Sequence, residues 1–229
     1  MPKFFAAAGR FTMEWFLSAG LLPGIKLNEG GEPAGGWGVV YCYGNRLEAV
    51  RSPRSRSDNA VFGQLVEVRT DMALLYLHNQ NQILSPRLVQ PFFRWGSGGA
   101  WAFCHIGQIP HPERLISESR CPDGPDPGEI LFMHILERFN PDKPAESLSA
   151  IFPESEEWEI SLCLISADTM VTFCRFGDNR QSETRLWLGK GELLRVVSSP
   201  PIVDLPGINW ESLPNNQVIV ITRERRAVI

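Results

Sequence analysis

Apolar residues recur along the chain with two different spacings, which predict strands and helices. Short apolar or alternating runs are typical of strands. They place strands at 3–8, 39–43, 46–50, 72–78, 100–104, 158–166, 170–176, 184–188, 193–197 and 218–222. Apolar positions three and four residues apart place helices at 12–22, 59–68, 128–139 and 145–152. Strands at both ends with helices grouped between them predict one α+β domain over residues 1–229, with two stacked sheets and the helices outside.

The stretch from Pro91 to Ile109 is the centre of this pattern. A glycine-rich turn at 96–99 leads into the apolar run 100–104, which ends on His105-Ile106-Gly107. Glycine tolerates positive φ and close approach of the backbone, so a strand that ends at such a turn can direct N–H groups at a ligand. We therefore expect a strand end and a binding turn at this place.

Composition and charge exclude several classes of function. The chain has 229 residues and a formal net charge of −4, which disfavours a nucleic-acid binder. Its apolar runs are much shorter than the ~20 residues that span a bilayer, so no membrane segment is expected. Residues 1–8 do not form a complete signal-peptide core, because Gly9 and Arg10 interrupt it. A cytoplasmic location is therefore predicted.

The cysteines indicate buried thiols. There are five of them, with no C-x-x-C pair, which suits a reducing compartment and predicts no metal site and no cofactor. Cys104 and His105 are the only adjacent Cys/His pair. Neighbours on a strand point to opposite faces, so these two side chains are not expected to form a thiolate–imidazolium pair.

Short motifs in a fixed order carry a resemblance to a known family. They are Gly35-Gly36-Trp37-Gly38, His78-Asn79-Gln80-Asn81-Gln82, Gln90-Pro91-Phe92, His105-Ile106-Gly107-Gln108, Asp126-Pro127-Gly128-Glu129 and Ser198-Ser199-Pro200-Pro201-Ile202. Their order resembles that of the class II glutamine amidotransferases, and most closely their small stand-alone members, over nearly the whole chain. The resemblance implies a four-layer αββα sandwich of two stacked, mainly antiparallel sheets, the fold of the N-terminal-nucleophile hydrolases.

The same resemblance implies that two reactive groups of the family are missing. Its nucleophile is a cysteine exposed when the initiator methionine is removed, and that position is Pro2 here. The arginine that binds the substrate carboxylate falls on Gln80. A neutral amide cannot supply the charge-assisted fork of a guanidinium.

Two further positions of the implied site also depart from the family. The asparagine that helps to hold the oxyanion falls on Ile106, although Gly107 still has a backbone N–H. Loss of one such donor typically costs ~10²–10³ in rate. The aspartate that receives the substrate amino group falls on Pro127, with Asp126 one residue away.

The residues that remain around this site predict a possible cleft. His78 and His105 each end a predicted central strand, and the resemblance places both near the implied pocket. Trp37 and Phe92 would be its apolar walls, and Asp126 a polar group at its edge. The alternative is that both histidines only form hydrogen bonds within the core.

We therefore expect a class II glutamine amidotransferase-like protein without glutaminase activity, acting as a binding or regulatory module. Its partner would be an amino-acid-like or γ-glutamyl small molecule, or another protein. One alternative is an active glutamine amidotransferase or γ-glutamyl amide hydrolase with a rebuilt site. Another is an unrelated α+β protein whose turns mimic the family. Release of ammonia from glutamine separates the first reading from the active enzyme.

Overall fold

A computed structural model describes residues 3–21, 36–53, 60–78, 86–96, 98–115, 126–153, 158–177, 184–202 and 205–223. The strands are β1 (Lys3–Gly9), β2 (Trp37–Tyr43), β3 (Arg46–Ser52), β4 (Met72–Leu77), β5 (Phe92–Gly96), β6 (Gly99–Gln108), β7 (Glu159–Ile165), β8 (Thr169–Arg175), β9 (Trp187–Lys190), β10 (Leu194–Ser199), β11 (Asn209–Ser212) and β12 (Val218–Thr222). The helices are α1 (Met13–Leu21), α2 (Ala60–Leu65), α3 (Pro127–Arg138) and α4 (Pro144–Ile151), with short 3₁₀ turns η2 (Pro86–Leu88) and η3 (Pro112–Leu115).

The described strands form two antiparallel sheets. The larger has the order β11-β9-β10-β1-β4-β2-β3 and the smaller the order β12-β8-β7-β6-β5. β1 lies at the centre of the larger sheet, where it pairs with β10 on one side and β4 on the other. Its sequence, KFFAAAG, is apolar on both faces, as expected for a strand that is covered on both sides.

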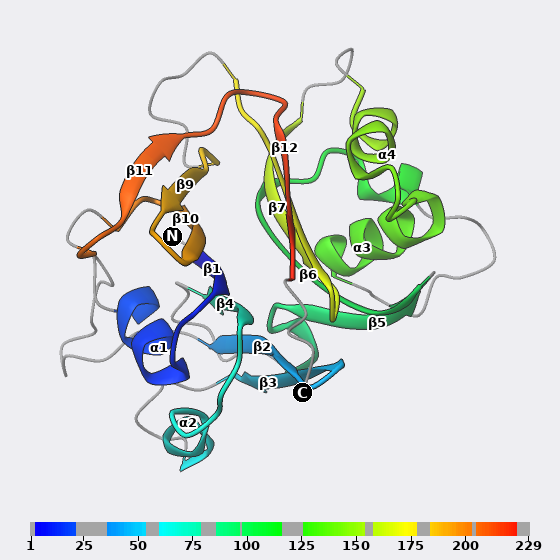
Figure 1. The fold of residues 1–229 in the computed structure, drawn as a ribbon. Helices are drawn as coiled ribbons and strands as arrows, with labels where there is room; N and C mark the ends of the chain where they lie inside the picture. The colour runs from blue at the N-terminus through cyan, green and yellow to red at the C-terminus, as the bar shows by residue number, and fades with distance from the viewer. Residues whose placement is uncertain are drawn as a thin grey trace, which may run out of the picture.

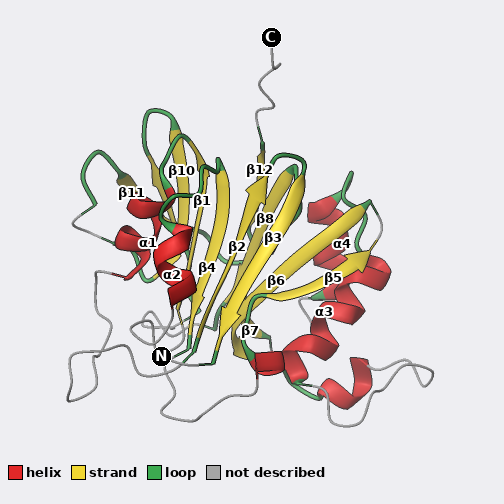
Figure 2. Ribbon diagram, turned by 90° about the horizontal axis from the view of Figure 1, so that it is seen from below, coloured by secondary structure: helices red, strands yellow, loops and turns green. Residues whose placement is uncertain are grey.

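Three buried clusters hold the layers together. Alternate residues of β1 separate two of them, because Phe4 and Ala6 face the second sheet while Phe5 and Ala7 face α1. The third cluster lies beneath α3 and α4 on the outer face of the smaller sheet. Figures 1 and 2 show the resulting order of helices, sheet, sheet and helices. The predicted αββα sandwich is confirmed.

Helix boundaries follow local sequence signals. The Thr12 hydroxyl accepts a hydrogen bond from the backbone N–H of Trp15 (3.1 Å) at the start of α1. Asp126 caps α3 by accepting from the N–H of Gly128 (2.8 Å), and Pro127 occupies the first turn. The predicted helix at 59–68 is shorter than expected, since α2 ends at Leu65.

Several predictions along the chain need correction, among them the strand expected at 184–188, which is β9 at Trp187–Lys190. β6 does not end at His105 but continues to Gln108, because its backbone pairs with β7 as far as Glu159. The stretch after Pro91 is the strand β5, which pairs with β6, and β11 was not predicted at all. Both missed strands lie at sheet edges, where apolar periodicity is weak because one side of the strand faces solvent.

Candidate functional site

Two of the residues singled out in the sequence, His78 and His105, lie at one end of the sandwich. Lys3 at the start of β1 pairs with Leu77 at the end of β4, and Trp37 at the start of β2 pairs with the same residue. His78 follows directly, and its backbone N–H donates to the carbonyl of Gly36 (2.9 Å). From the second sheet, β6 brings His105 to this end. The prediction that the two histidines lie close together agrees with this placement.

Gln90 connects the two histidines. It is 6% exposed, and its backbone N–H donates to Nε2 of His78 (3.0 Å). Its side-chain carbonyl accepts from the backbone N–H of His105 (2.7 Å), and its amide lies 3.4 Å from the hydroxyl of Tyr76 as a donor. Gln90 therefore joins β4, β6 and the segment before β5 through hydrogen bonds that are largely hidden from water.

Both histidines are neutral at physiological pH. Burial lowers the pKa of His78 to about 4. Burial, with a further contribution from the nearby His78, also lowers the pKa of His105 to about 4. Because Nε2 of His78 accepts a hydrogen bond, the proton of that neutral ring lies on Nδ1. A histidine with these properties is a weak base near pH 7, and at His78 the lone pair of Nε2 is already used.

The N-terminus of α3 closes the site on the helix side. The ring of His105 lies against Gly128, where an added Cβ would approach Nε2 to 2.3 Å. Burial raises the pKa of Asp126, while hydrogen bonds from the backbone of Gly128 and Glu129 act against that shift. Glu129 forms an ion pair with Arg94 of β5. Glycine at 128 is thus required for the close approach of helix and imidazole.

The two predicted apolar walls do not lie together. Trp37 belongs to the cluster on the outer face of the larger sheet, beneath α1. Phe92 belongs to the cluster on the outer face of the smaller sheet, beneath α3, where its ring approaches Gly128. The two sheets separate them, so the structure does not bring these rings to a shared pocket wall.

Sequence reasoning missed Gln90 and Tyr76 as parts of this arrangement. Gln90 stood within a quoted motif, and its position between the buried residues Val89 and Phe92 was a usable signal. A polar side chain in an apolar stretch must find hydrogen-bond partners inside the protein. Tyr76 gave a weaker signal, because a tyrosine in a buried strand is common.

Sequence comparisons give no relative: no family profile matches the chain, and no curated protein is detectably similar in sequence. Solved structures do match. Glutamine phosphoribosylpyrophosphate amidotransferase from B. subtilis, complexed with ADP and GMP, aligns over 96% of this chain with a TM-score of 0.71 and 17% identity. The chain has the class II glutamine amidotransferase fold. The sequence resemblance is confirmed at that level.

Smaller proteins share this glutamine amidotransferase fold over most of their length. A glutamine aminotransferase class-II domain protein from Silicibacter pomeroyi aligns over 96% of this chain and 94% of its own, with a TM-score of 0.61 and 15% identity. A predicted glutamine amidotransferase from Pseudomonas aeruginosa aligns over 96% of this chain and 93% of its own, with a TM-score of 0.57 and 16% identity. By contrast, the chain spans only 47% of the B. subtilis enzyme. Identities this low describe the fold and do not carry over an activity.

Three of the family positions lie within the described part of the glutamine amidotransferase fold. Ile106 is 5% exposed and packs in the core between the sheets. Gly107 has a φ of 109° and lies against the carbonyl of Glu159, where a Cβ would come within 2.1 Å. Pro127 is exposed in the first turn of α3. Pro2 and Gln80, the other two predicted positions, lie outside the described residues.

The described cysteines are all buried. Cys42, Cys104, Cys163 and Cys174 are reduced and inaccessible, and burial raises the pKa of each thiol, that of Cys174 to about 11. Cys104 lies in the core between the sheets, whereas the ring of His105 stacks on Phe103 on the helix side. The two side chains point to opposite faces, as predicted. A thiol in such surroundings is a poor nucleophile.

The described part of the chain shows neither a metal cluster nor a membrane-spanning helix. No group of three or more His, Cys, Asp or Glu residues there is arranged to hold a metal ion. None of the helices in that part is long and apolar enough to cross a bilayer.

Proposed function

We propose that this chain is a class II glutamine amidotransferase-like protein without glutaminase activity, acting as a binding or regulatory module. The observation that carries the proposal is the set of hydrogen bonds around Gln90. The side-chain carbonyl of Gln90 accepts from the backbone N–H of His105, and its amide donates to the Tyr76 hydroxyl. The backbone N–H of Gln90 donates to Nε2 of His78. The polar groups of Gln90 and Nε2 of His78 thus satisfy one another inside the fold, hold it together and are not poised to activate a substrate.

The buried position of Ile106 supports the same proposal. In the class II glutamine amidotransferases that this chain resembles, an asparagine stands at that position. Isoleucine has no side-chain hydrogen-bond donor. Ile106 is held in the core between the sheets, so this position supplies no side-chain donor for an oxyanion. Stabilisation of a developing oxyanion is often the largest single contribution to acyl-transfer catalysis.

The proposal of a binding role is supported by His105. Its Nδ1 is buried and has no hydrogen-bond partner within the described residues. A buried polar atom of this kind is costly unless something pairs with it. A ligand that carries amide or amino groups, such as a γ-glutamyl compound, has the chemistry to form that bond.

The test is release of ammonia from glutamine at high protein concentration, with B. subtilis phosphoribosylpyrophosphate amidotransferase assayed in parallel. We expect no release above the protein-free blank. Release that is proportional to protein and that is lost in Gln90→Leu would overturn the proposal in favour of a rebuilt amidohydrolase site. In the same preparation, γ-glutamyl amides should still raise the thermal unfolding midpoint of the protein. The His105→Gln variant should show a smaller increase.

A further inference from the structure

A second concave site lies at the opposite end of the sandwich. A cavity of about 620 Å³ opens where β1 ends and β4 begins. At this end Ala8 pairs with Met72, and the N–H of Gly9 donates to the carbonyl of Asp71 (2.8 Å). The seven residues of β1 separate this cavity from the His78 end by about 20 Å, at ~3.4 Å per residue. The cavity is therefore not part of the site described above.

Four chain segments form the walls of the cavity. They are residues 8–11, 70–71, 192–195 and 221–223. The first three belong to the ends of strands in the larger sheet, and the last is the end of β12 in the smaller sheet. The walls thus come from both sheets, at the point where residues 221–223 bring them together.

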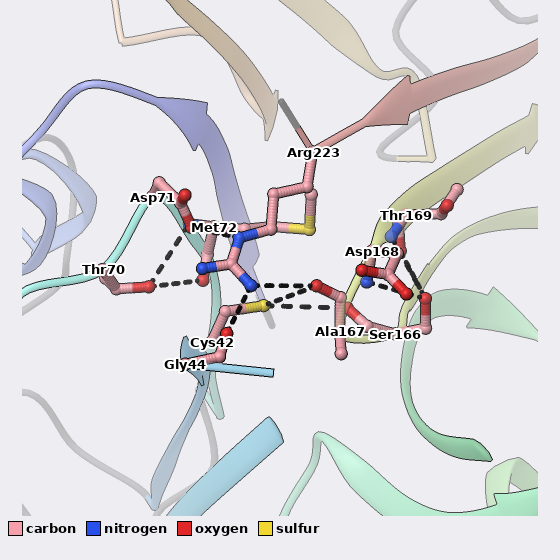
Figure 3. A network of polar contacts seen from close by, with 10 residues as sticks. All are labelled: Cys42, Gly44, Thr70, Asp71, Met72, Ser166, Ala167, Asp168, Thr169 and Arg223. Atoms are coloured by element: carbon pink, nitrogen blue, oxygen red, sulfur yellow. Dashed lines mark hydrogen bonds and ion pairs between the residues drawn. The ribbon is translucent and has the colours of Figure 1, made fainter. Parts of the chain in front are cut away.

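Arg223 fixes the relative position of these walls (Figure 3). Its Nε forms an ion pair with Asp71 (2.6 Å), and its Nη1 donates to the carbonyl oxygens of Gly44 and Ala167. Its backbone N–H donates to the carbonyl of Asp168 (2.7 Å). The side chain is only 14% exposed. A guanidinium held by this many contacts is a fixed part of the cavity wall, and Asp71 balances its charge.

Two more arginines lie on the other walls. Arg10 follows β1, is exposed, and has no ion-pair partner within the described residues. The Nη1 of Arg195 donates to the carbonyls of Gly191 (2.7 Å) and Leu194 (3.0 Å), which leaves its other N–H groups available. The cavity therefore gathers three guanidinium groups in a chain whose net charge is −4.

The carboxylates that line the cavity cancel only part of this charge, because Asp71 and Glu192 stand against three arginines. Asp71 is paired with Arg223, and Glu192 is exposed at the rim. Arg10 and Arg195 thus face a single unpaired carboxylate. Guanidinium groups form bidentate hydrogen bonds with carboxylate and phosphate oxygens, so the charge favours an anion of this planar or tetrahedral kind.

Apolar side chains complete the surface. Leu193 is 51% exposed although it is a large hydrophobic residue, and Phe11 is a second apolar residue of the lining. Gly9 brings β1 against this segment: its φ is 129°, and an added Cβ would lie 2.1 Å from the carbonyl of Leu193. An exposed leucine at a rigid cavity is a surface that a ligand can cover with an apolar group.

We propose that this cavity binds a small organic anion, a carboxylate or phosphate joined to an apolar body. Arg10 and Arg195 would hold the anionic group, the Arg223–Asp71 pair would fix the wall behind it, and Leu193 would cover the apolar part. This inference does not depend on whether the chain hydrolyses glutamine, since the two sites lie at opposite ends of the sandwich.

The test is a titration of the full chain by isothermal calorimetry and by amide chemical shifts. Phenyl phosphate and 3-phenylpropionate are the probes, and inorganic phosphate and benzyl alcohol each supply only one half of the proposed ligand. We expect saturable binding of at least one probe and clearly weaker binding of both halves. The preferred probe distinguishes a phosphate from a carboxylate ligand.

Variants assign the binding to this cavity. Arg10→Gln and Arg195→Gln should each weaken the preferred probe about tenfold or more, because each removes a charge-assisted contact. Glu192→Gln should raise the affinity for the preferred probe. Leu193→Ser should lower the affinity for that probe without changing the affinity for inorganic phosphate. Arg114→Gln, an exposed arginine of η3 outside the lining, is the matched control and should have no effect.

Three results would overturn the proposal. The first is no saturable binding of either probe at millimolar concentration. The second is binding that survives both arginine replacements. The third is an affinity for inorganic phosphate equal to that for phenyl phosphate, which would remove the apolar part of the proposed ligand. Thermal unfolding of each variant would establish that it is folded, as expected for exposed positions.

Discussion

Lowering the pH from 7 to 5 should destabilise the protein through His78 and His105. Burial holds the pKa of both rings at about 4, below the ordinary value of 6.5. Between these two values the unfolded chain binds protons that the folded chain does not. The free energy of unfolding is therefore unaffected by these groups above pH 6.5 and falls as the pH drops from 6.5 towards 4.

The size of the effect follows from the shifts. Each pH unit in this window is worth ~1.4 kcal/mol for each histidine. A pH of 5 is about 1.5 units below the ordinary histidine pKa. At this pH each ring therefore lowers the free energy of unfolding by about 2 kcal/mol, and both together by about 4 kcal/mol. A loss of this size is large against the ~5–15 kcal/mol of a typical domain. Asp126, whose pKa is raised, acts in the opposite direction at lower pH, which is why the comparison stops at pH 5.

The assay is urea unfolding at pH 7, 6 and 5, followed by circular dichroism. His78→Gln keeps an acceptor for the N–H of Gln90 and should remove about half of the pH-dependent loss, ~2 kcal/mol. His105→Gln should do the same. His111→Gln replaces an exposed histidine outside the site and should keep the wild-type slope. An identical loss in the wild type and in the His78→Gln/His105→Gln double variant would refute the reasoning.

Three further predictions concern single contacts. Arg223→Met removes an ion pair to Asp71 and a hydrogen bond to Gly44, both of which join the two sheets, together with a hydrogen bond to Ala167 within the smaller sheet. It should lower the free energy of unfolding by about 2–3 kcal/mol; urea unfolding with no change of midpoint would contradict the role of this residue. Ile106→Asn buries an amide between the sheets and should cost ~2–4 kcal/mol without producing ammonia from glutamine; a stable variant that releases ammonia would show that one donor suffices to restore the chemistry. Gly128→Ala places a Cβ 2.3 Å from Nε2 of His105 and should cost ~1–3 kcal/mol in the same unfolding assay. Gly63→Ala, in α2 with open space around it, is the control and should be neutral or stabilising by up to ~1 kcal/mol; equal losses in the two glycine variants would rule out the contact with His105.

Strands with a strong apolar pattern could be predicted from sequence alone. β1 and β4 are continuous apolar runs because both of their faces are buried, one by the second sheet and one by α1. Edge strands have no such constraint. In β5 the side chain of Trp95 is 79% exposed and Arg94 is partly so, so nothing in the residue pattern distinguishes this strand from a loop.

The prediction of a turn after His105 was wrong for a different reason. Gly107 does adopt a positive φ, as the sequence interpretation required. Its function in the fold is to let β6 pass close to the backbone of Glu159 while the strand continues. Glycine can mark a close approach within a strand as well as a turn, and the pairing with β7 decides between these two uses here.

The candidate site was predictable in part. The family resemblance placed His78 and His105 near one another, and both contact Gln90. The separation of Trp37 from Phe92 was not predictable, because it depends on which face of each sheet a strand directs outward. The role of Gln90 depends on the register between three segments far apart in sequence, which no local pattern records.

The central claim is that a glutamine amidotransferase fold persists here without its attacking group. Incubation with a glutamine-mimicking chloroketone, followed by intact-mass spectrometry, tests this directly, since covalent capture reports a reactive nucleophile even when turnover is too slow to detect. We predict no mass increase under conditions in which the B. subtilis amidotransferase is fully labelled. A single stoichiometric adduct, mapped by peptide digestion to the end of the sandwich that holds His78 and His105, would contradict it.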